Sequence, residues 1–322
     1  MTSLEEAVLA VLAGASLETV AARHALHPAV LADATETYRT AGAAAIDRQT
    51  EHEGWHQVRI RFPDRHTAER IAAEHLAPAL RRAEDAGLLT TWWFVRKHDW
   101  RLRWHPTPGS PRHELRSCIE SRLDKLLAQK KITGWWRTLY EPEEHAFGGR
   151  EAMEAAHRLF HRDSDHVLDY VGQRPGALSA GRCELSVLLC GLLMRAAGQE
   201  WNEQGDIWAR VSDNRPTATR MLPEPWRANL GPLCRLLTVD VAPYGPLLRP
   251  GGSLHFAAGW VTAFEQAGRT LRTLADDGRL SRGLRSVLAT HVLFHWNRFG
   301  LPETAQARLA ATAANVILQA DV

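Results

Sequence analysis

Several features that would assign this chain to a common class are missing from it. No apolar run approaches the roughly 20 residues that span a bilayer, and the chain begins MTSLEEA, with acidic residues where a signal peptide carries basic ones. Its four cysteines form no CxxC pair. The formal net charge is only +2, whereas a general nucleic-acid binder needs a large basic surplus. We therefore expect a cytoplasmic protein without a disulfide framework, a zinc site or a membrane span.

Tryptophan is abundant where tyrosine is scarce, with twelve tryptophans against four tyrosines. Several tryptophans are clustered, at 92–93, at 100 and 104, and at 135–136. Core packing is the ordinary explanation of such clusters. The functional alternative is an aromatic wall for a peptide that carries flat heterocycles, because such rings stack well on indole faces.

The first 50 residues differ in character from the rest. Residues 3–46 are rich in Ala, Leu and Val and predict short helices, interrupted near Gly14 and at His27-Pro28. The segment SLETVAARHAL resembles the first helix of a helix-turn-helix, but residues 1–48 carry six carboxylates against three arginines. DNA affinity depends on neutralising phosphates, so DNA binding is disfavoured. We expect a helical appendage at 1–50 that docks or packs.

The segment 51–148 predicts a sheet with helices. Val58, Ile60 and Phe62 alternate with Arg59 and Arg61, which is the pattern of a half-buried strand. Further along, the pattern predicts a helix at 66–86 that Gly87 ends, strands at 90–96 and 100–105, a helix at 113–129 and a strand at 132–140. This β-α-β-β-α-β order is that of a ferredoxin-like sheet.

The segment 149–322 is mainly helical in its pattern. Helices are predicted at 151–171, 178–197, 253–274, 281–297 and 304–319. The stretch 216–250 carries seven prolines and predicts an irregular connection. The fold class is therefore α+β, with a sheet region followed by a mainly α-helical half.

Four arginines share one face if this topology holds, because the first and third strands then lie side by side. They are Arg59, Arg61, Arg101 and Arg103. Like charges directly opposed in a sheet are destabilising, so the cluster indicates an anionic partner, or an open face that water screens. An RNA-recognition module shares this strand order, but Trp100 and Trp104 alternate away from the arginines and could not stack bases beside them.

Two short motifs carry groups that could do chemistry. The run YEPEEH at 140–145 places three carboxylates and an imidazole directly after a strand, where a rigid element can aim them. A solvated acidic loop is the alternative. His291 and His295 lie four residues apart on one helix face, but zinc needs a third ligand that the sequence does not supply. Core or acid–base roles fit them better.

Several runs of residues resemble the C-terminal glutamate-elimination domain of lantibiotic dehydratases and their stand-alone thiopeptide relatives. They are WFVR at 93–96 with WRLRW at 100–104, YEPE at 140–143 with FGG at 147–149, and LF at 159–160 with DS at 163–164. The run HWNR at 295–298 resembles that family's closing motif. The resemblance extends in order along residues 55–320. It implies that 51–148 and 149–322 pack together as one elimination-domain-like catalytic unit.

Two activities occur in the family that the chain resembles. Eliminating members carry a functional arginine three residues after the Glu143 position, where this chain has Ala146, and a histidine four residues before Asn297, where it has Leu293. An FHWNR-type ending and an N-terminal helical segment are typical of the pyridine synthases. The resemblance therefore implies a thiopeptide macrocyclase that joins two dehydroalanines by a formal [4+2] aza-cycloaddition, with loss of the leader peptide.

Two alternatives remain open. One is a stand-alone glutamate-eliminating dehydratase component that makes dehydroalanine or dehydrobutyrine from glutamylated Ser or Thr. The other is a non-catalytic protein that binds a peptide. The synthase resemblance implies no metal or redox cofactor, and its partner is a modified precursor peptide with an acidic leader and a core of azoles and dehydroalanines.

The cyclisation needs proton transfers and a surface that folds a long peptide, so the candidate residues form two groups. Proton carriers and orienting groups are predicted at Tyr140, Glu143, Ser253, His255, His295, Asn297 and Arg298. Contacts to the peptide or its leader are predicted at Arg59, Arg61, Arg101, Arg103, Trp93 and Trp260.

Overall fold

The computed structural model describes residues 3–52, 54–110, 112–173, 181–215, 230–239, 241 and 245–318. The chain divides into two compact units, residues 1–55 and 56–322. Across the described residues, none of the helices combines the length and apolar character that a bilayer crossing requires.

The N-terminal unit consists of three helices with a small core of their own. They are α1 (Ser3–Leu12), α2 (Leu17–Arg23) and α3 (Pro28–His52). Val8, Val20 and Leu31, one from each helix, are buried together. The predicted interruptions are confirmed, because α1 ends before Gly14, whose φ is +100°, and α3 begins at Pro28, a residue suited to a first helical position. The 25-residue α3 is longer than the short helices expected.

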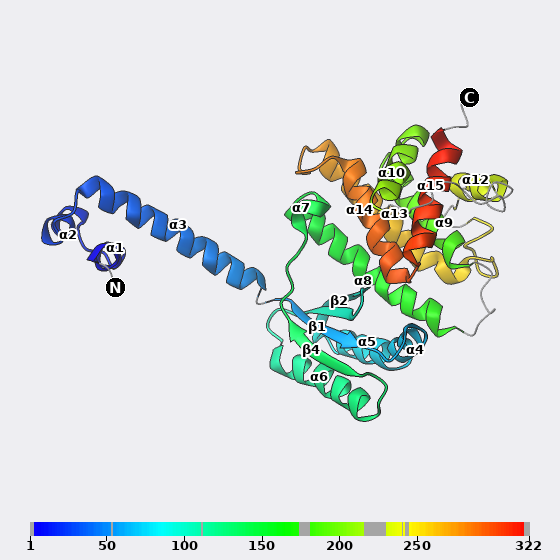
Figure 1. The fold of residues 1–322 in the computed structure, drawn as a ribbon, viewed down its shortest axis with the longest axis horizontal. Coiled ribbons are helices and arrows are strands. Elements are labelled where there is room, and N and C mark those ends of the chain that lie inside the picture. Colours follow the sequence, from blue (N-terminus) through cyan, green and yellow to red (C-terminus); the bar gives the residue numbers. More distant parts are fainter. Residues whose placement is uncertain are drawn as a thin grey trace. The chain divides into compact units, whose positions relative to one another are not determined.

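The second unit contains a four-stranded sheet, in the order β2-β3-β1-β4 with every neighbouring pair antiparallel (Figure 1). The strands are β1 (His56–Arg61), β2 (Leu89–Arg96), β3 (Trp100–Pro106) and β4 (Gly134–Thr138). The first and third strands lie side by side as predicted, and Arg59 stands directly opposite Arg101.

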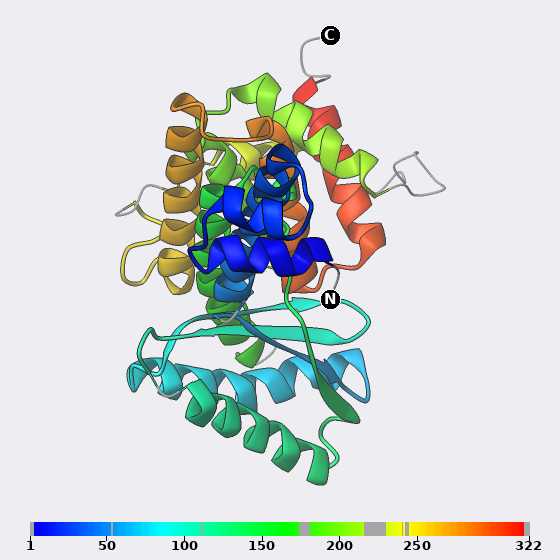
Figure 2. The same cartoon turned by 90° about the vertical axis from the view of Figure 1, so that its left-hand side faces the viewer.

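One face of the sheet is covered by the helices that alternate with the strands, as Figure 2 shows. They are α4 (Arg65–Ile71), the π-helical turn η1 (Ala72–Leu76), α5 (Ala77–Asp85) and α6 (Arg112–Ala128). Trp100 and Trp104 are buried in this core, with the Trp100 ring stacked on Phe94 at 4.8 Å between centroids. Core packing therefore explains these tryptophans, and they lie on the face opposite to the arginines, as the alternation predicted.

The helical half covers part of the other face. Its elements are α7 (Glu144–Phe147), α8 (Arg150–Gly172), α9 (Arg182–Ala196), α10 (Trp201–Asp213), α12 (Leu230–Thr238), η2 (His255–Ala257), α13 (Ala258–Asp276), α14 (Leu284–Phe299) and α15 (Glu303–Leu318). Helix α8 packs on β2, and α14 reaches the same strand. The α+β class and the helical second half are thus confirmed.

Three helices were not predicted. Helices α7 and α10 had no counterpart among the expected elements, and α12 lies inside the proline-rich stretch that we expected to be irregular. That prediction was wrong for 230–238; residues 216–229 lie outside the described ones. Pro232 is compatible with α12 because it occupies the first turn, where a backbone N–H has no helical partner.

Candidate functional site

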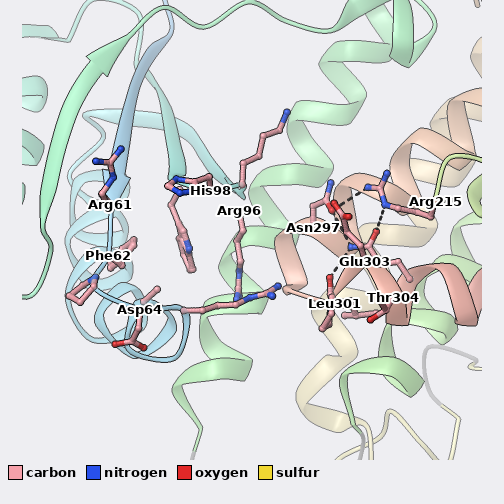
Figure 3. Close-up of a pocket in the computed structure, with 17 residues that line it drawn as sticks. Arg61, Phe62, Asp64, Arg96, His98, Arg215, Asn297, Leu301, Glu303 and Thr304 are labelled. Atoms are coloured by element: carbon pink, nitrogen blue, oxygen red, sulfur yellow. Dashed lines mark hydrogen bonds between the residues drawn. The ribbon is translucent and has the colours of Figure 1, made fainter. Parts of the chain in front are cut away.

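A cleft of about 1010 Å³ lies between the sheet region and the helical half. One wall is the end of β1 with the following loop and the β2–β3 turn; the other is the end of α14 with the start of α15 (Figure 3). The lining residues that bear on the chemistry are Arg61, Arg65, Arg96, Lys97, His98, Arg215, Asn297 and Gln306. The cleft is therefore rich in cations.

Local structure holds each wall in place. Asp64 receives hydrogen bonds from the Thr67 backbone N–H at 2.9 Å and the Thr67 hydroxyl at 2.7 Å, which fixes the start of α4. Gly300 ends α14 with a φ of +79°. A Cβ at Gly300 would stand 2.5 Å from Arg96 Nη1, so glycine is required both by the backbone and by the neighbouring guanidinium.

One lining residue, Arg96, belongs to an ion triad. Glu69 on α4 accepts hydrogen bonds from Arg96 on β2 and from Arg182 on α9. Burial alone would raise the pKa of Glu69, but the two guanidiniums outweigh it and lower this pKa to about 2. Burial lowers the pKa of Arg96 to about 10, and its guanidinium lies 4.6 Å from the Trp100 ring centroid. These three charges hold the elements together and neutralise one another in part.

The four arginines of the sheet face have different environments. Arg61 forms an ion pair with Asp99 at 2.9 Å. Arg103 is buried between the rings of Trp93 and Tyr140, at 4.1 and 4.3 Å from their centroids, and donates to Gln57. Arg59 and Arg101 are half-buried and form no hydrogen bond or ion pair within the described residues. Only this last pair is available to an anion without breaking an existing contact.

Tyr140 and His157 form a neutral pair beside the buried Arg103. The Tyr140 hydroxyl is hydrogen-bonded to His157 Nε2 at 2.7 Å. Burial, followed by the nearby Arg103, lowers the pKa of His157 to about 3, so this imidazole is neutral at neutral pH. Burial also raises the pKa of Tyr140 well above its usual value. The phenol therefore stays protonated and can serve as a donor.

Glu143 and Lys97 bring opposite charges to the edge of this group. Glu143 is exposed at the start of α7, and its charge acts on Lys97, Arg103 and Tyr140. Lys97 lies in the β2–β3 turn and lines the cleft. Lys97 was read from the sequence only as part of a turn, and no spacing or pattern would have selected it.

Three predicted residues lie in the core instead of the cleft. His295, Arg298 and Trp260 all bond to Asp163 of α8, which is 0 % exposed. The distances to the carboxylate are 2.8 Å from Trp260 Nε1, 3.0 Å from His295 Nδ1 and 2.5 Å from Arg298 Nη1. Their contact with substrate stays a prediction, and the geometry favours a positioning role.

The remaining predicted residues are divided between the cleft and other places. Asn297 lines the cleft, where its Oδ1 accepts from Gln306 at 3.1 Å and from Arg215 at 3.4 Å. Ser253 and His255 are exposed before α13, where the His255 ring is 2.9 Å from the Leu248 carbonyl oxygen, and neither lines the cleft. Trp93 is buried against Phe160 at 4.7 Å.

The structure thus brings Arg59, Arg101, Arg103 and Tyr140 together on one face of the sheet, with the Glu143 charge acting on Arg103 and Tyr140, and places Asn297 in the cleft. Sequence reasoning gave no role to Lys97, His157 or Asp163, although Asp163 belongs to the DS run that carries part of the family resemblance. Among the described residues, no three His, Cys, Asp or Glu side chains are grouped as a metal site would require.

Comparison with known proteins gives one family and several related folds. The family model described as lantibiotic biosynthesis dehydratase C-term matches residues 55–317. Similar solved structures include the tRNA-dependent lantibiotic dehydratase MibB from Microbispora sp. 107891, with a TM-score of 0.61, 19% identity and coverage of 83% of this chain. This chain spans only 28% of MibB. No curated protein matches the sequence.

Two other similar structures have nearly the same extent as the matched part of this chain. TsrL has a TM-score of 0.58 at 16% identity and is covered over 96% of its length. The pyridine synthase TbtD from thiomuracin biosynthesis has a TM-score of 0.55 at 15% identity and is covered over 98%. Each alignment includes 83% of this chain. At these identities the likeness establishes a shared fold.

Proposed function

Since this chain belongs to the lantibiotic biosynthesis dehydratase C-terminal family, we propose that it is a pyridine synthase of thiopeptide biosynthesis. Its substrate would be a modified precursor peptide, and its reaction a formal [4+2] aza-cycloaddition between two dehydroalanines with loss of the leader peptide. The fold shared with the pyridine synthase TbtD supports this proposal. So does the site, which combines proton carriers with a cationic surface for a peptide.

The observation that carries the choice of reaction is the apolar character of two positions at the edge of the site. By the resemblance described above, Ala146 on α7 and Leu293 on α14 occupy the positions at which eliminating members of the family carry an arginine and a histidine. The two helices meet there, because the Phe147 and Phe294 rings lie 4.9 Å apart. Eliminating glutamate requires cationic stabilisation of the enolate and the departing carboxylate. A cycloaddition has no such leaving group, so it tolerates the apolar replacements.

One contact favours the alternative, a glutamate-eliminating dehydratase component. Arg282 donates to the Ala146 carbonyl oxygen at 3.4 Å, so a guanidinium does lie beside the position where the family arginine is missing. This arginine is exposed and long enough to reach a substrate carboxylate. If the protein eliminates glutamate, Arg282→Gln should abolish the release of glutamate. If it is a pyridine synthase, the same substitution should leave ring formation intact.

The proposed chemistry needs a base, a hydrogen-bond donor and a wall. Glu143 is the exposed carboxylate that accepts the amide proton when a dehydroalanine and the preceding carbonyl form a 2-azadiene. Tyr140, which burial keeps protonated, is the hydrogen-bond donor beside Arg103, and Asn297 offers its amide in the cleft. Trp93 and Arg103 support Tyr140 from behind. Holding the two dehydroalanines together can supply about 7–11 kcal/mol of the barrier.

The buried residues would act through these groups. His295 and Arg298 fix α14 through Asp163, and Arg298 Nε also donates to the Phe94 carbonyl oxygen of β2 at 3.0 Å. They therefore set the distance between the sheet and the helix that carries Asn297. Ser253, His255 and Trp260 remain predictions of the sequence.

Mass spectrometry separates the candidate functions. Purified protein is given a glutamylated precursor and, separately, an azole-containing peptide with two preinstalled dehydroalanines. The proposal expects no change in the first and a cyclised product with a released leader fragment in the second. Free glutamate from the first peptide with the second left linear would establish elimination instead. If the protein binds both peptides but converts neither of them, the non-catalytic peptide-binding alternative is supported.

We propose that Arg59 and Arg101 hold acidic residues of the leader, with Arg61 and Arg103 shaping the same face. The pair Arg59→Gln with Arg101→Gln should weaken binding of a labelled leader in fluorescence polarisation and flatten its dependence on salt. Arg137→Gln is the matched control, because Arg137 pairs with Glu120 of α6 on the opposite face. Unchanged affinity of the double variant for the leader would show that the leader binds at another surface.

The N-terminal unit is proposed to contribute to peptide binding. Its own small core suggests that its removal leaves the second unit folded. A chain beginning near Asp47 should therefore unfold at a similar temperature but convert the peptide less well. Full activity after truncation would show that the N-terminal unit does not contribute to peptide binding. If the full chain shifts duplex DNA in a gel at physiological salt, the conclusion that the acidic N-terminal unit does not bind DNA is wrong.

We also propose that 51–148 is a ferredoxin-like region that packs with 149–322 as one catalytic unit. The strand order and antiparallel sense support the first part, and the cleft with walls from both regions supports the second. A cytoplasmic location stays a prediction.

A further inference from the structure

Lys97 differs from the other cations of the cleft. Those cations already have partners: Arg61 and His98 are close to Asp99, Arg65 donates to the Gly300 carbonyl oxygen, Arg96 pairs with Glu69, and Arg215 bonds to Gln306 and Asn297. Among the described lining residues, Lys97 is the cation that forms neither a hydrogen bond nor an ion pair. Its ammonium is therefore free to contact a substrate.

The position of Lys97 brings its charge within range of the proposed base. Lys97 lines the cleft next to His98 of the β2–β3 turn, and Figure 3 shows His98 on the wall opposite Asn297 and Arg215 of the helical half. Its charged neighbours on its own side are Arg101 and Arg103 of β3, Arg59 of β1 and the Glu143 carboxylate. The charges of both the proposed leader surface and the proposed base thus act on Lys97.

The surroundings also make the Lys97 proton easier to transfer. Lys97 is exposed, but the protein around it partly desolvates its ammonium; this desolvation and then the charge of Arg101 lower the pKa of Lys97, with smaller effects from Arg103 and Arg59, while Glu143 opposes them. An ammonium with a lowered pKa is a better acid near neutral pH and can recover its proton within a catalytic cycle.

We infer that Lys97 is a catalytic residue, the general acid that works opposite Glu143 in forming the 2-azadiene; this inference rests on the proposed function. The Lys97 ammonium gives its proton to the carbonyl oxygen that precedes the first dehydroalanine. Glu143 takes the proton from the amide nitrogen. The amide becomes its imidic-acid tautomer, and the pair is left as a neutral amine and a carboxylic acid.

The same pair is restored after the ring closes. The cycloadduct carries the former carbonyl oxygen as a hydroxyl group on a ring carbon. Glu143 returns its proton to this hydroxyl, which leaves as water, while the Lys97 amine takes a proton from the ring methylene that came from the first dehydroalanine. The C–H electron pair forms a ring C=C bond, and the N=C pair of the cycloadduct shifts to form a C=N bond at the carbon that lost the hydroxyl. Protons and electron pairs balance, and no oxidant or reductant is required.

The test uses full-length protein and the peptide with preinstalled dehydroalanines. Lys97→Gln should lower kcat by about 100-fold or more, with KM changed by less than about threefold. Lys97→Arg keeps the charge but cannot release its proton, so kcat should also fall, and the decline of the wild-type rate at high pH should disappear. Lys125→Gln on α6, whose side chain is exposed, is the control and should leave the rate unchanged.

Acylation of lysines by acetic anhydride, followed by mass spectrometry across pH, gives a second measurement that needs no turnover. Lys97 should be modified at lower pH than Lys125, and bound peptide should protect it. If Lys97→Gln makes the ring at more than half the wild-type rate, or changes only KM, the catalytic role is overturned while the synthase proposal stands. A wild-type protein that makes no ring overturns the synthase proposal and this proton transfer with it.

Discussion

Replacing Asp163 by Asn removes one buried negative charge while keeping the shape of the side chain. Asp163 accepts from the Trp260 indole, the His295 imidazole and the Arg298 guanidinium, and all four side chains are at most 2 % exposed. The asparagine can still accept from Trp260 through its carbonyl oxygen. What it cannot do is balance the charge of Arg298, whose Nη2 already has no hydrogen-bond partner.

The expected loss follows from this burial. Removing one partner of a buried ion pair costs about 3–5 kcal/mol, because the other charge is left uncompensated. The free energy of unfolding of a domain is about 5–15 kcal/mol, so Asp163→Asn should remove a large fraction of the stability. Asp276→Asn is the control, since its pair with Arg272 joins side chains that are 60% and 70% exposed. Such a pair contributes about 0–1 kcal/mol.

Urea unfolding followed by tryptophan fluorescence measures both variants. Arg298→Met and the double variant Asp163→Asn/Arg298→Met complete a cycle, and the double variant should cost clearly less than the sum of the single ones. If Asp163→Asn costs no more than Asp276→Asn, or if the two single effects simply add, the carboxylate is not the counter-charge that holds α14 to the sheet.

Three further predictions concern stability. His157 and His291 each have a pKa of about 3 in the folded protein because burial disfavours their charged form, whereas the pKa in the unfolded chain is about 6.5. The urea midpoint of unfolding should therefore be constant above about pH 6.5 and fall as the pH drops toward 3, and a midpoint that does not change with pH would contradict this. His291→Leu should raise the free energy of unfolding by about 1–2 kcal/mol, because both buried ring nitrogens lack a partner, and a loss in urea unfolding would point to an unseen partner. Gly148→Ala should cost more in thermal unfolding than Gly87→Ala, since both have positive φ but only at Gly148 would a Cβ meet a side chain, 2.9 Å from Val287 Cγ2; equal losses would show that this contact relaxes freely.

Sequence patterns predicted those strands and helices in which buried and exposed residues alternate with a regular period. The alternation of Val58 and Ile60 with Arg59 and Arg61 predicted β1, and Gly87, with φ of +69°, follows the end of α5. Helix α10 was missed because Gln204 and Gly205 occupy its buried face. Glycine is needed there, since a Cβ would lie 2.6 Å from Leu318 of α15. No local pattern reports a requirement that a distant helix imposes.

The site was harder to predict than the fold, because partners decide what a polar residue can do. Alternation placed the arginines on one face, but it could not tell that Asp99 neutralises Arg61 or that two rings and Gln57 enclose Arg103. Likewise, the HWNR motif attracted attention to His295, whose partner Asp163 is 132 residues away in sequence. A buried Asp in a helix has no periodic signature of its own.

The placement of carboxylates explains where unpaired cations remain on a nearly neutral protein. Asp99, Glu69 and Asp163 hold Arg61, Arg96 and Arg298, whereas Arg59 and Arg101 on the sheet and Lys97 in the adjoining turn form no hydrogen bond or ion pair within the described residues.

An acidic leader bound to Arg59 and Arg101 would cancel the charges that lower the pKa of Lys97, and that pKa would rise. On the proposed function, the bound leader then keeps Lys97 protonated for the first proton transfer. When the leader fragment departs, the uncancelled arginines favour the neutral amine again. Leader binding and the protonation of Lys97 are coupled by this charge distribution, and by linkage the affinity for the leader must depend on the same titration.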